Sequence, residues 1–267
     1  MPLRITALIR SEIFKMFHMK LTYFFLACGV AIILFWGIST SYFFPDGSQP
    51  GTGYIFLLSS NQTTMSFLGV IFIMIFGSIL ISSETASGTL HMNLVNPISR
   101  LEFLSAKLII GWLFSLLLVL SMALPALAIG GFKFGYGHYV EEGLILFTRQ
   151  QIFTGIMAGF LVLSVILLAY VSFSLLISVL TSNPGYAIGL CVGSVLLMDF
   201  VRGRLNISPF LFQSYLETPF ELAKRMPEGF DIAWKPDIYL CLGIPLAWTV
   251  VCFAAALLIF MRKDYKS

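Results

Sequence analysis

Long stretches without a single charged residue limit what this sequence can fold into. They are Leu21–Phe44, Gly47–Ser83, Leu108–Phe132, Gln150–Met198 and Ile238–Met261. A helix needs about 20 apolar residues to cross a bilayer, and a charge at its centre costs roughly 2.5–3.5 kcal/mol or more. Composition agrees, because 58% of the residues are apolar and 11% are charged, against about 25% charged in soluble domains. We therefore predict an integral membrane protein.

The runs predict six spans. Gly47–Ser83 opens with a polar stretch, Gly47–Thr63, so its span is placed at about 64–83. Gln150–Met198 is too long for one helix and is interrupted by the turn sequence Thr181-Ser182-Asn183-Pro184-Gly185, so it holds two. The expected spans are about 21–43, 64–83, 108–130, 152–180, 186–201 and 238–261. The predicted fold class is an all-α membrane protein, a single transmembrane domain over residues 1–267.

Two segments next to the spans have helical patterns of their own. Residues 3–17 repeat apolar side chains at helical spacing with charges between them, which predicts an amphipathic elbow helix at the membrane surface. The sequence Thr218-Pro219-Phe220-Glu221 combines an N-cap, a first-turn proline and a capping-box acid. It predicts a short helix from Pro219 to about Met226, within a small external cap over 202–237.

The segment 84–107, which we call the inner loop, has interruptions and a helix start. Gly88 and Pro97 interrupt any continuous helix, which leaves Thr89–Asn96 for a short helix on the membrane surface. Ser99 and Glu102 have capping-box spacing. A new helix should therefore begin near Arg100 and run into the third span.

Basic residues near the helix ends orient the chain. Arg4, Arg10, Lys15 and Lys20 precede the first span, and the loop after that span has only Asp46. An even number of spans puts both termini on one side, and the positive-inside rule makes that side the cytoplasm. The inner loop then faces the cytoplasm, and the cap lies outside.

Several functions lack the residues they need. All four cysteines (Cys28, Cys191, Cys241 and Cys252) fall within predicted spans, which argues against a disulfide framework or a metal cluster. No histidine lies in a span and no HExxH occurs, so intramembrane proteolysis is not expected. The chain also lacks a G-x-x-x-x-G-K-[ST] phosphate loop, so we expect it neither to bind ATP nor to be an enzyme. Its net charge of +3 gives no argument for nucleic acid.

Two features of the fifth span have both a functional and a structural interpretation. Asp199 could be the coupling site of an ion-driven carrier, but pairing with Arg202 at the helix end is the preferred interpretation. Gly185, Gly189 and Gly193 repeat at four-residue spacing, which lets helices approach closely. They would form a dimer or translocation interface, or pack within one bundle, and the pattern favours neither.

Two further sets of residues have a preferred structural interpretation. Gly155 and Gly159 in the fourth span are expected to pack within the bundle. Ser59 and Asn61–Thr64, near the outer mouth of the second span, could touch a substrate, but a solvated loop is preferred.

The inner loop contains the most specific pattern. Its sequence reads Glu84-Thr85-Ala86-Ser87-Gly88-Thr89-Leu90, then Asn96-Pro97-Ile98-Ser99-Arg100-Leu101-Glu102-Phe103, and Lys107. It resembles the inner loop of type-2 ATP-binding-cassette (ABC) transporter permeases, in which an acid ending the second span, a Gly-Thr pair, a short helix and a Pro-[Ile/Val]-Ser-Arg turn recur in this order. The elbow, the six spans, the external insertion and the basic tail extend the resemblance over the whole chain.

The resemblance implies how the loop would be used. In this family the short inner helix is the coupling helix, which docks on a separate ATP-hydrolysing subunit. Carried over, Thr89–Asn96 would dock, and Glu84 and Arg100 would anchor the loop. The implied coupling residues are Glu84, Gly88, Thr89, Leu90, Met92, Asn93, Leu94, Pro97, Arg100 and Glu102.

We therefore expect the membrane-spanning permease subunit of an ABC exporter in a bacterial cytoplasmic (inner) membrane, moving an unidentified substrate by alternating access. Its expected partners are a cytoplasmic ABC ATPase subunit that binds ATP and magnesium, a second permease half, the lipid bilayer and a periplasmic or surface protein. An identical second half is preferred to a paralogue. The alternatives are a non-transporting scaffold or assembly subunit coupled to an ATPase, and a secondary carrier.

Overall fold

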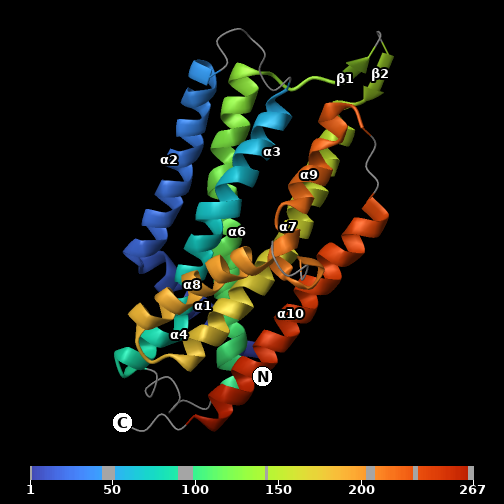
Figure 1. Ribbon diagram of the computed structural model, residues 1–267. Helices are drawn as coiled ribbons and strands as arrows, with labels where there is room; N and C mark the ends of the chain where they lie inside the picture. Colours follow the sequence, from blue (N-terminus) through green and yellow to red (C-terminus); the bar gives the residue numbers. More distant parts are fainter. Residues whose placement is uncertain are drawn as a thin grey trace.

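Long helices form a bundle in the computed structural model, which describes residues 2–43, 52–89, 99–141, 144–202, 208–230 and 234–263. The long helices are α1 (Pro2–His18), α2 (Lys20–Phe43), α3 (Gly53–Thr64), α4 (Val70–Ala86), α6 (Arg100–Lys133), α7 (Arg149–Leu180), α8 (Pro184–Arg202) and α10 (Trp234–Arg262). Shorter elements are strands β1 (Tyr139–Glu141) and β2 (Leu144–Phe147), helix α9 (Thr218–Lys224), and 3-10 turns at Ser208–Phe210, Phe212–Tyr215 and Met226–Glu228. Figure 1 shows the hairpin at one end of the bundle and α1 near the other.

Six described helical segments are long and apolar enough to cross a membrane, as the sequence predicted. They are Lys20–Ser39, Gly53–Ala86, Arg100–Lys133, Arg149–Leu180, Pro184–Arg202 and Ile238–Arg262. The predicted break in the longest charge-free run is present, because α7 ends at Leu180 and α8 begins at Pro184. Proline suits that first position, where its missing N–H leaves no hydrogen bond unmade. The all-α membrane fold class is confirmed.

The second span differs from the prediction at its outer end. Its helix begins at Gly53 rather than near residue 64, and continues through a π-helical turn, Met65–Gly69, into α4. The polar residues expected in a solvated loop are therefore helical, and Asn61 is fully buried. The reason is that the polar side chains bond to the helix's own backbone: Asn61 Nδ2 donates to Leu57 O at 2.8 Å, and Thr64 Oγ1 to Ser60 O at 2.7 Å.

The start of α3 lies directly against the end of α6. A Cβ atom on Gly53 would come within 2.5 Å of the Gly130 carbonyl oxygen, so only glycine permits this approach. The backbone N–H of Gly53 donates to the carbonyl of Gly135 at 2.9 Å. Close packing of two backbones thus fixes the first half of the second span on the third.

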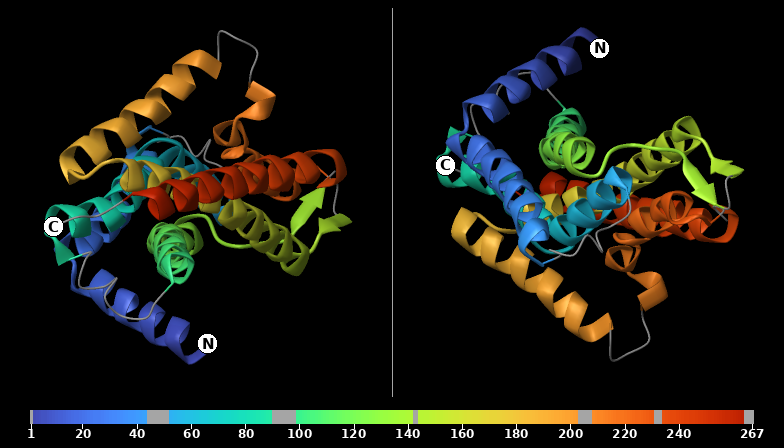
Figure 2. Two further views of the ribbon diagram at one scale, coloured as in Figure 1. Left: turned by 90° about the horizontal axis from the view of Figure 1, so that it is seen from below. Right: turned by 90° about the horizontal axis from the view of Figure 1, so that it is seen from above.

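The core lies where α4, α6 and α7 meet. α4 packs against α7 and α8, α2 lies along α6, and α10 lies along α7. Phe76 of α4 stacks on Phe114 of α6 with ring centroids 3.9 Å apart. Figure 2, seen along the bundle, shows α1 and α8 on opposite sides of this core.

The predicted external helix is present but packs into the bundle. α9 covers Thr218–Lys224 and lies against α7 and α3, with Phe220 buried. Thr218 is its first helical residue rather than its cap, which is Glu217 and makes no side-chain cap bond. The sequence analysis did not predict the hairpin of β1 and β2, whose Tyr139 packs on Gly229 at φ +90°. The external position of this segment stays a prediction.

Candidate functional site

Four charged side chains meet where the inner loop leaves the bundle. Glu84 ends α4, Lys107 lies two turns into α6, and Glu12 and Lys15 lie one turn apart on α1. Lys107 Nζ is 2.6 Å from Glu12 Oε2 and 2.7 Å from Glu84 Oε1. Lys15 Nζ is 2.6 Å from Glu12 Oε1 and 3.1 Å from Glu84 Oε1. We call this closed arrangement the four-charge ring.

The ring is mostly buried and electrically balanced. The Lys107 and Glu12 side chains are 3% and 4% exposed, Glu84 is 13% exposed and Lys15 is 47% exposed. Burial alone would raise the pKa of Glu12, but the charges and hydrogen bonds of Lys107 and Lys15 outweigh it and hold that pKa below its ordinary value. Burial would lower the pKa of Lys15, and the two carboxylates reverse this and raise it. The ring therefore favours the charged forms of Glu12 and Lys15.

The ring borders a small cavity between three helices. Its volume is about 400 Å³, and its polar wall includes all four ring residues and His18. Its apolar floor is formed by Phe76, Ile79, Leu80 and Ile110. Apolar surroundings strengthen electrostatic attraction and make an unpaired charge costly. The ring therefore ties α1, α4 and α6 together at the first flank of the inner loop.

Arg100 fixes the second flank to a different helix. Its Nη1 donates to the carbonyl oxygens of Phe260 at 2.5 Å and Met261 at 2.8 Å, near the end of α10. Carbonyls in the last turn of a helix have no partner within it and carry partial negative charge, so a guanidinium suits them. Lys263, just beyond α10, donates to the carbonyl of Val179 at 3.1 Å, near the end of α7. The second flank is thus held by α10, which is tied to α7.

The capping box predicted before α6 is confirmed. Ser99 Oγ accepts from the Glu102 backbone N–H at 3.2 Å, and a Glu102 carboxylate oxygen accepts from the Ser99 N–H at 2.9 Å. Gly88 has φ +71°, a left-handed conformation that ends α4. Thr89 is described, and its hydroxyl oxygen lies 2.9 Å from that of Ser87. The other predicted coupling residues, Leu90, Met92, Asn93, Leu94 and Pro97, lie outside the described residues.

The ring contains a residue to which the sequence analysis gave no role. Glu12 counted only as a charge on the polar side of the elbow, and Lys15 only as a determinant of orientation. The available signal was Glu12, which lies between Arg10 and Lys15 in the amphipathic segment and three residues before that lysine. Such a pair reads equally well as a solvated helix surface.

The glycines of α8 face away from the rest of the chain. Of the described residues, none places a heavy atom within 4 Å of a Cβ added to Gly189 or Gly193, and at Gly185 only Asn183 does so. By contrast, a Cβ on Gly159 would lie 3.0 Å from the Pro219 carbonyl oxygen, so that glycine packs within the bundle as expected. Tyr186, Leu190 and Leu197 on α8 are also exposed. The role of the α8 glycines in an interface stays a prediction.

Asp199 has a local partner. Its Oδ1 lies 3.2 Å from Arg202 Nε, one turn further along α8, and both side chains are more than one third exposed. This matches the preferred interpretation of a pair at the helix end. Among the described residues, no three His, Cys, Asp or Glu side chains are grouped so that they could hold a metal ion.

Comparison with known protein families identifies a match over most of the chain. A family model described as "ABC-2 family transporter protein" matches residues 8–198, more than two thirds of the chain. The match covers the inner loop, Arg100 and the whole four-charge ring, and it ends one residue before Asp199. No curated protein matches the sequence.

Proposed function

Because the chain belongs to the ABC-2 transporter family, we propose that it is the permease subunit of an exporter driven by ATP hydrolysis in a separate cytoplasmic subunit. Family and fold establish a multi-pass ABC-type membrane permease. The bacterial inner membrane, the cytoplasmic termini and the outward direction of transport belong to the proposal. ATP and magnesium would be bound by the partner, and the substrate is left open.

The observation that carries the proposal is the anchoring of both inner-loop flanks. A push on the loop would act through Glu84 on α1 and α6, because the ring joins these helices at 2.6–3.1 Å. The same push would act through Arg100 on the end of α10. Helices joined in this way would move as a rigid group, which is what alternating access by rigid-body rocking requires.

The proposal includes a second permease half. One chain has one inner loop, and two ATPase subunits closing on ATP would need two. The exposed glycines and apolar side chains of α8 support a second copy of this chain on that face, because small residues allow close helix approach in lipid. We expect the short helix predicted at Thr89–Asn96 in the inner loop to dock on the ATPase.

Purification of the full chain from native membranes in mild detergent tests the proposal. We expect an ATPase subunit to co-purify with the wild-type chain. Glu84→Lys replaces a carboxylate that two lysines share, so the first flank should detach and the ATPase should be lost or uncoupled. Glu228→Lys is the control, since Glu228 is exposed, lies far from Glu84 in the sequence, and its replacement changes the net charge by the same amount.

The outcomes separate clearly. Retention of the ATPase and its activity by Glu228→Lys, with loss in a Glu84→Lys chain that still shows a cooperative thermal unfolding transition, supports the assignment. A scrambled inner loop that leaves the complex and its ATP hydrolysis intact would overturn it. A stable complex with one permease copy would remove the dimer from the proposal.

A further inference from the structure

The outward half of α1 carries a groove that the proposed function does not use. Its volume is about 950 Å³, and among the described residues its walls come from α1 alone. Glu12 and Met16 are buried against the bundle, so the residues on the other side of the helix face outward. The groove therefore lies on the surface that α1 presents to its surroundings.

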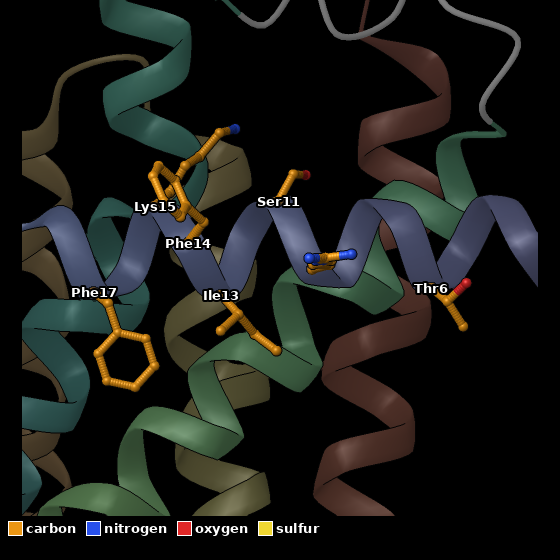
Figure 3. Close-up of a pocket in the computed structure, with 7 residues that line it drawn as sticks. Thr6, Ser11, Ile13, Phe14, Lys15 and Phe17 are labelled. Carbon is orange, nitrogen blue, oxygen red and sulfur yellow. The ribbon is translucent and has the colours of Figure 1, made fainter.

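The groove has a polar edge and an apolar edge. Figure 3 shows Ser11 and Lys15 projecting to one side of α1, and Ile13 and Phe17 projecting to the other, together with Thr6 nearer the start of the helix. Arg10 also lines the groove, four residues before Phe14. Helical spacing puts Arg10 and Phe14 on one face between the two edges. The Arg10 guanidinium thus lies between the polar edge and the apolar edge of the groove.

The outward face is cationic. Glu12, the acid among the described side chains of α1, points into the bundle and is held by Lys107 and Lys15. Arg10 is exposed, and within the described part of the chain it makes no ion pair. The ammonium of a zwitterionic headgroup would find no carboxylate partner among the described side chains on this face. A purely anionic group finds a complementary charge there.

The apolar side of the groove continues into a surface that must meet lipid. Phe14 and Phe17 are exposed, and so are Tyr23 and Phe24 at the start of α2. α2 begins two residues after α1 ends and is the first membrane span. Aromatic residues at the end of a span favour the bilayer interface. The groove is thus continuous with the interfacial part of the first span.

From this arrangement we propose that the outward groove of α1 binds an anionic phospholipid of the adjoining leaflet. The Arg10 guanidinium holds the headgroup phosphate, since its planar fork of N–H donors matches phosphate oxygens. Lys15, at the polar edge, is already paired with Glu12 and Glu84, so the charge that selects the headgroup comes from Arg10. Phe14 and Phe17 pack against the glycerol and the upper acyl chains. The elbow helix is then a site with a headgroup preference, in addition to an apolar anchor.

Thermal unfolding of the full chain in detergent, with added lipid, tests the charge requirement. Phosphatidylglycerol should stabilise the wild-type chain, and phosphatidylcholine should do so much less. Arg10→Gln should weaken the response to phosphatidylglycerol about fivefold in lipid concentration, since one interfacial basic residue contributes about 1 kcal/mol. Arg225→Gln is the control, because Arg225 is also exposed and the change in net charge is equal. An unchanged response in Arg10→Gln overturns the proposal.

Cross-linking locates the lipid. A photoreactive benzoylphenylalanine in place of Phe14, in vesicles with equal amounts of the two lipids, should form adducts mainly with phosphatidylglycerol. The same label at Phe132, which is 93% exposed at the other end of the third span, should react with both lipids equally. Equal labelling at Phe14, or adducts with protein rather than lipid, would overturn the proposal. Unfolding of Arg10→Gln without lipid should match that of the wild-type chain, which separates lost binding from lost folding.

Discussion

The four-charge ring and the α8 glycine face differ in whether the rest of the same chain supplies their contacts. Every charge of the ring has a partner at 2.6–3.1 Å, supplied by α1, α4 or α6. On α8, a Cβ added to Gly189 or Gly193 would come within 4 Å of no described atom beyond the neighbouring backbone of its own helix. Mutation of the ring should therefore act on folding of the single chain. Mutation of the α8 face should act on assembly.

Lys107→Met tests the self-contained region and has the largest expected effect. It would leave the buried Glu12 with Lys15 as its one ion-pair partner among the described residues, and breaking a buried pair on one side costs about 3–5 kcal/mol. We expect a large fall in the thermal unfolding temperature in detergent. Glu12→Gln with Lys107→Met should recover part of the loss, because no unpaired buried charge then remains. Wild-type stability in Lys107→Met would mean that the ring does not hold α1 to the bundle.

Two matched glycine substitutions test the contrast directly. Gly159→Leu would push into the Pro219 carbonyl and the Ala223 side chain, so it should destabilise the chain by about 1–3 kcal/mol. At Gly193 an added Cβ would come within 4 Å of no described atom beyond its own helix backbone, so Gly193→Leu should leave single-chain stability unchanged while reducing dimer cross-linking between α8 helices. Thermal unfolding and chemical cross-linking in native membranes measure the two effects. Equal destabilisation by both would contradict the comparison.

Arg100→Ala tests the second flank with a smaller expected effect. The guanidinium is partly buried and bonds two carbonyls at the end of α10, so we expect a loss of about 1–2 kcal/mol. Hydrogen exchange should rise in the last turn of α10 and remain unchanged in α2. Arg100→Lys should retain part of the protection, since one ammonium can still reach a carbonyl. Unchanged hydrogen exchange in the last turn of α10 would mean that Arg100 does not hold the inner loop to α10.

The helices were predictable from the sequence because hydrophobic runs report membrane insertion directly. The polar stretch before residue 64 was placed wrongly, because the Asn61 amide N–H and the Thr64 hydroxyl donate to the backbone of their own helix, which composition does not reveal. The capping box of Ser99 and Glu102 was predictable because it is local. The ring was not, since 95 residues separate Glu12 from Lys107 and only tertiary packing brings them together.

The smallest effect expected is a pH dependence of the ring at its two extremes. Glu12 has a pKa below its ordinary 4.5 in the folded chain, so its contribution is present above that value and is lost as pH falls through the lower, folded pKa. Lys15 has a pKa above its ordinary 10.5, so its contribution is full below 10.5 and is lost as pH rises through the higher, folded pKa. Stability should thus be flat around neutral pH and fall on both sides. In Lys107→Met the Glu12 pKa should rise, because burial then outweighs the remaining attraction, and the acid limb should begin at higher pH. If stability begins to fall at the same acidic pH in the wild-type chain and in Lys107→Met, other carboxylates determine the loss of stability in acid.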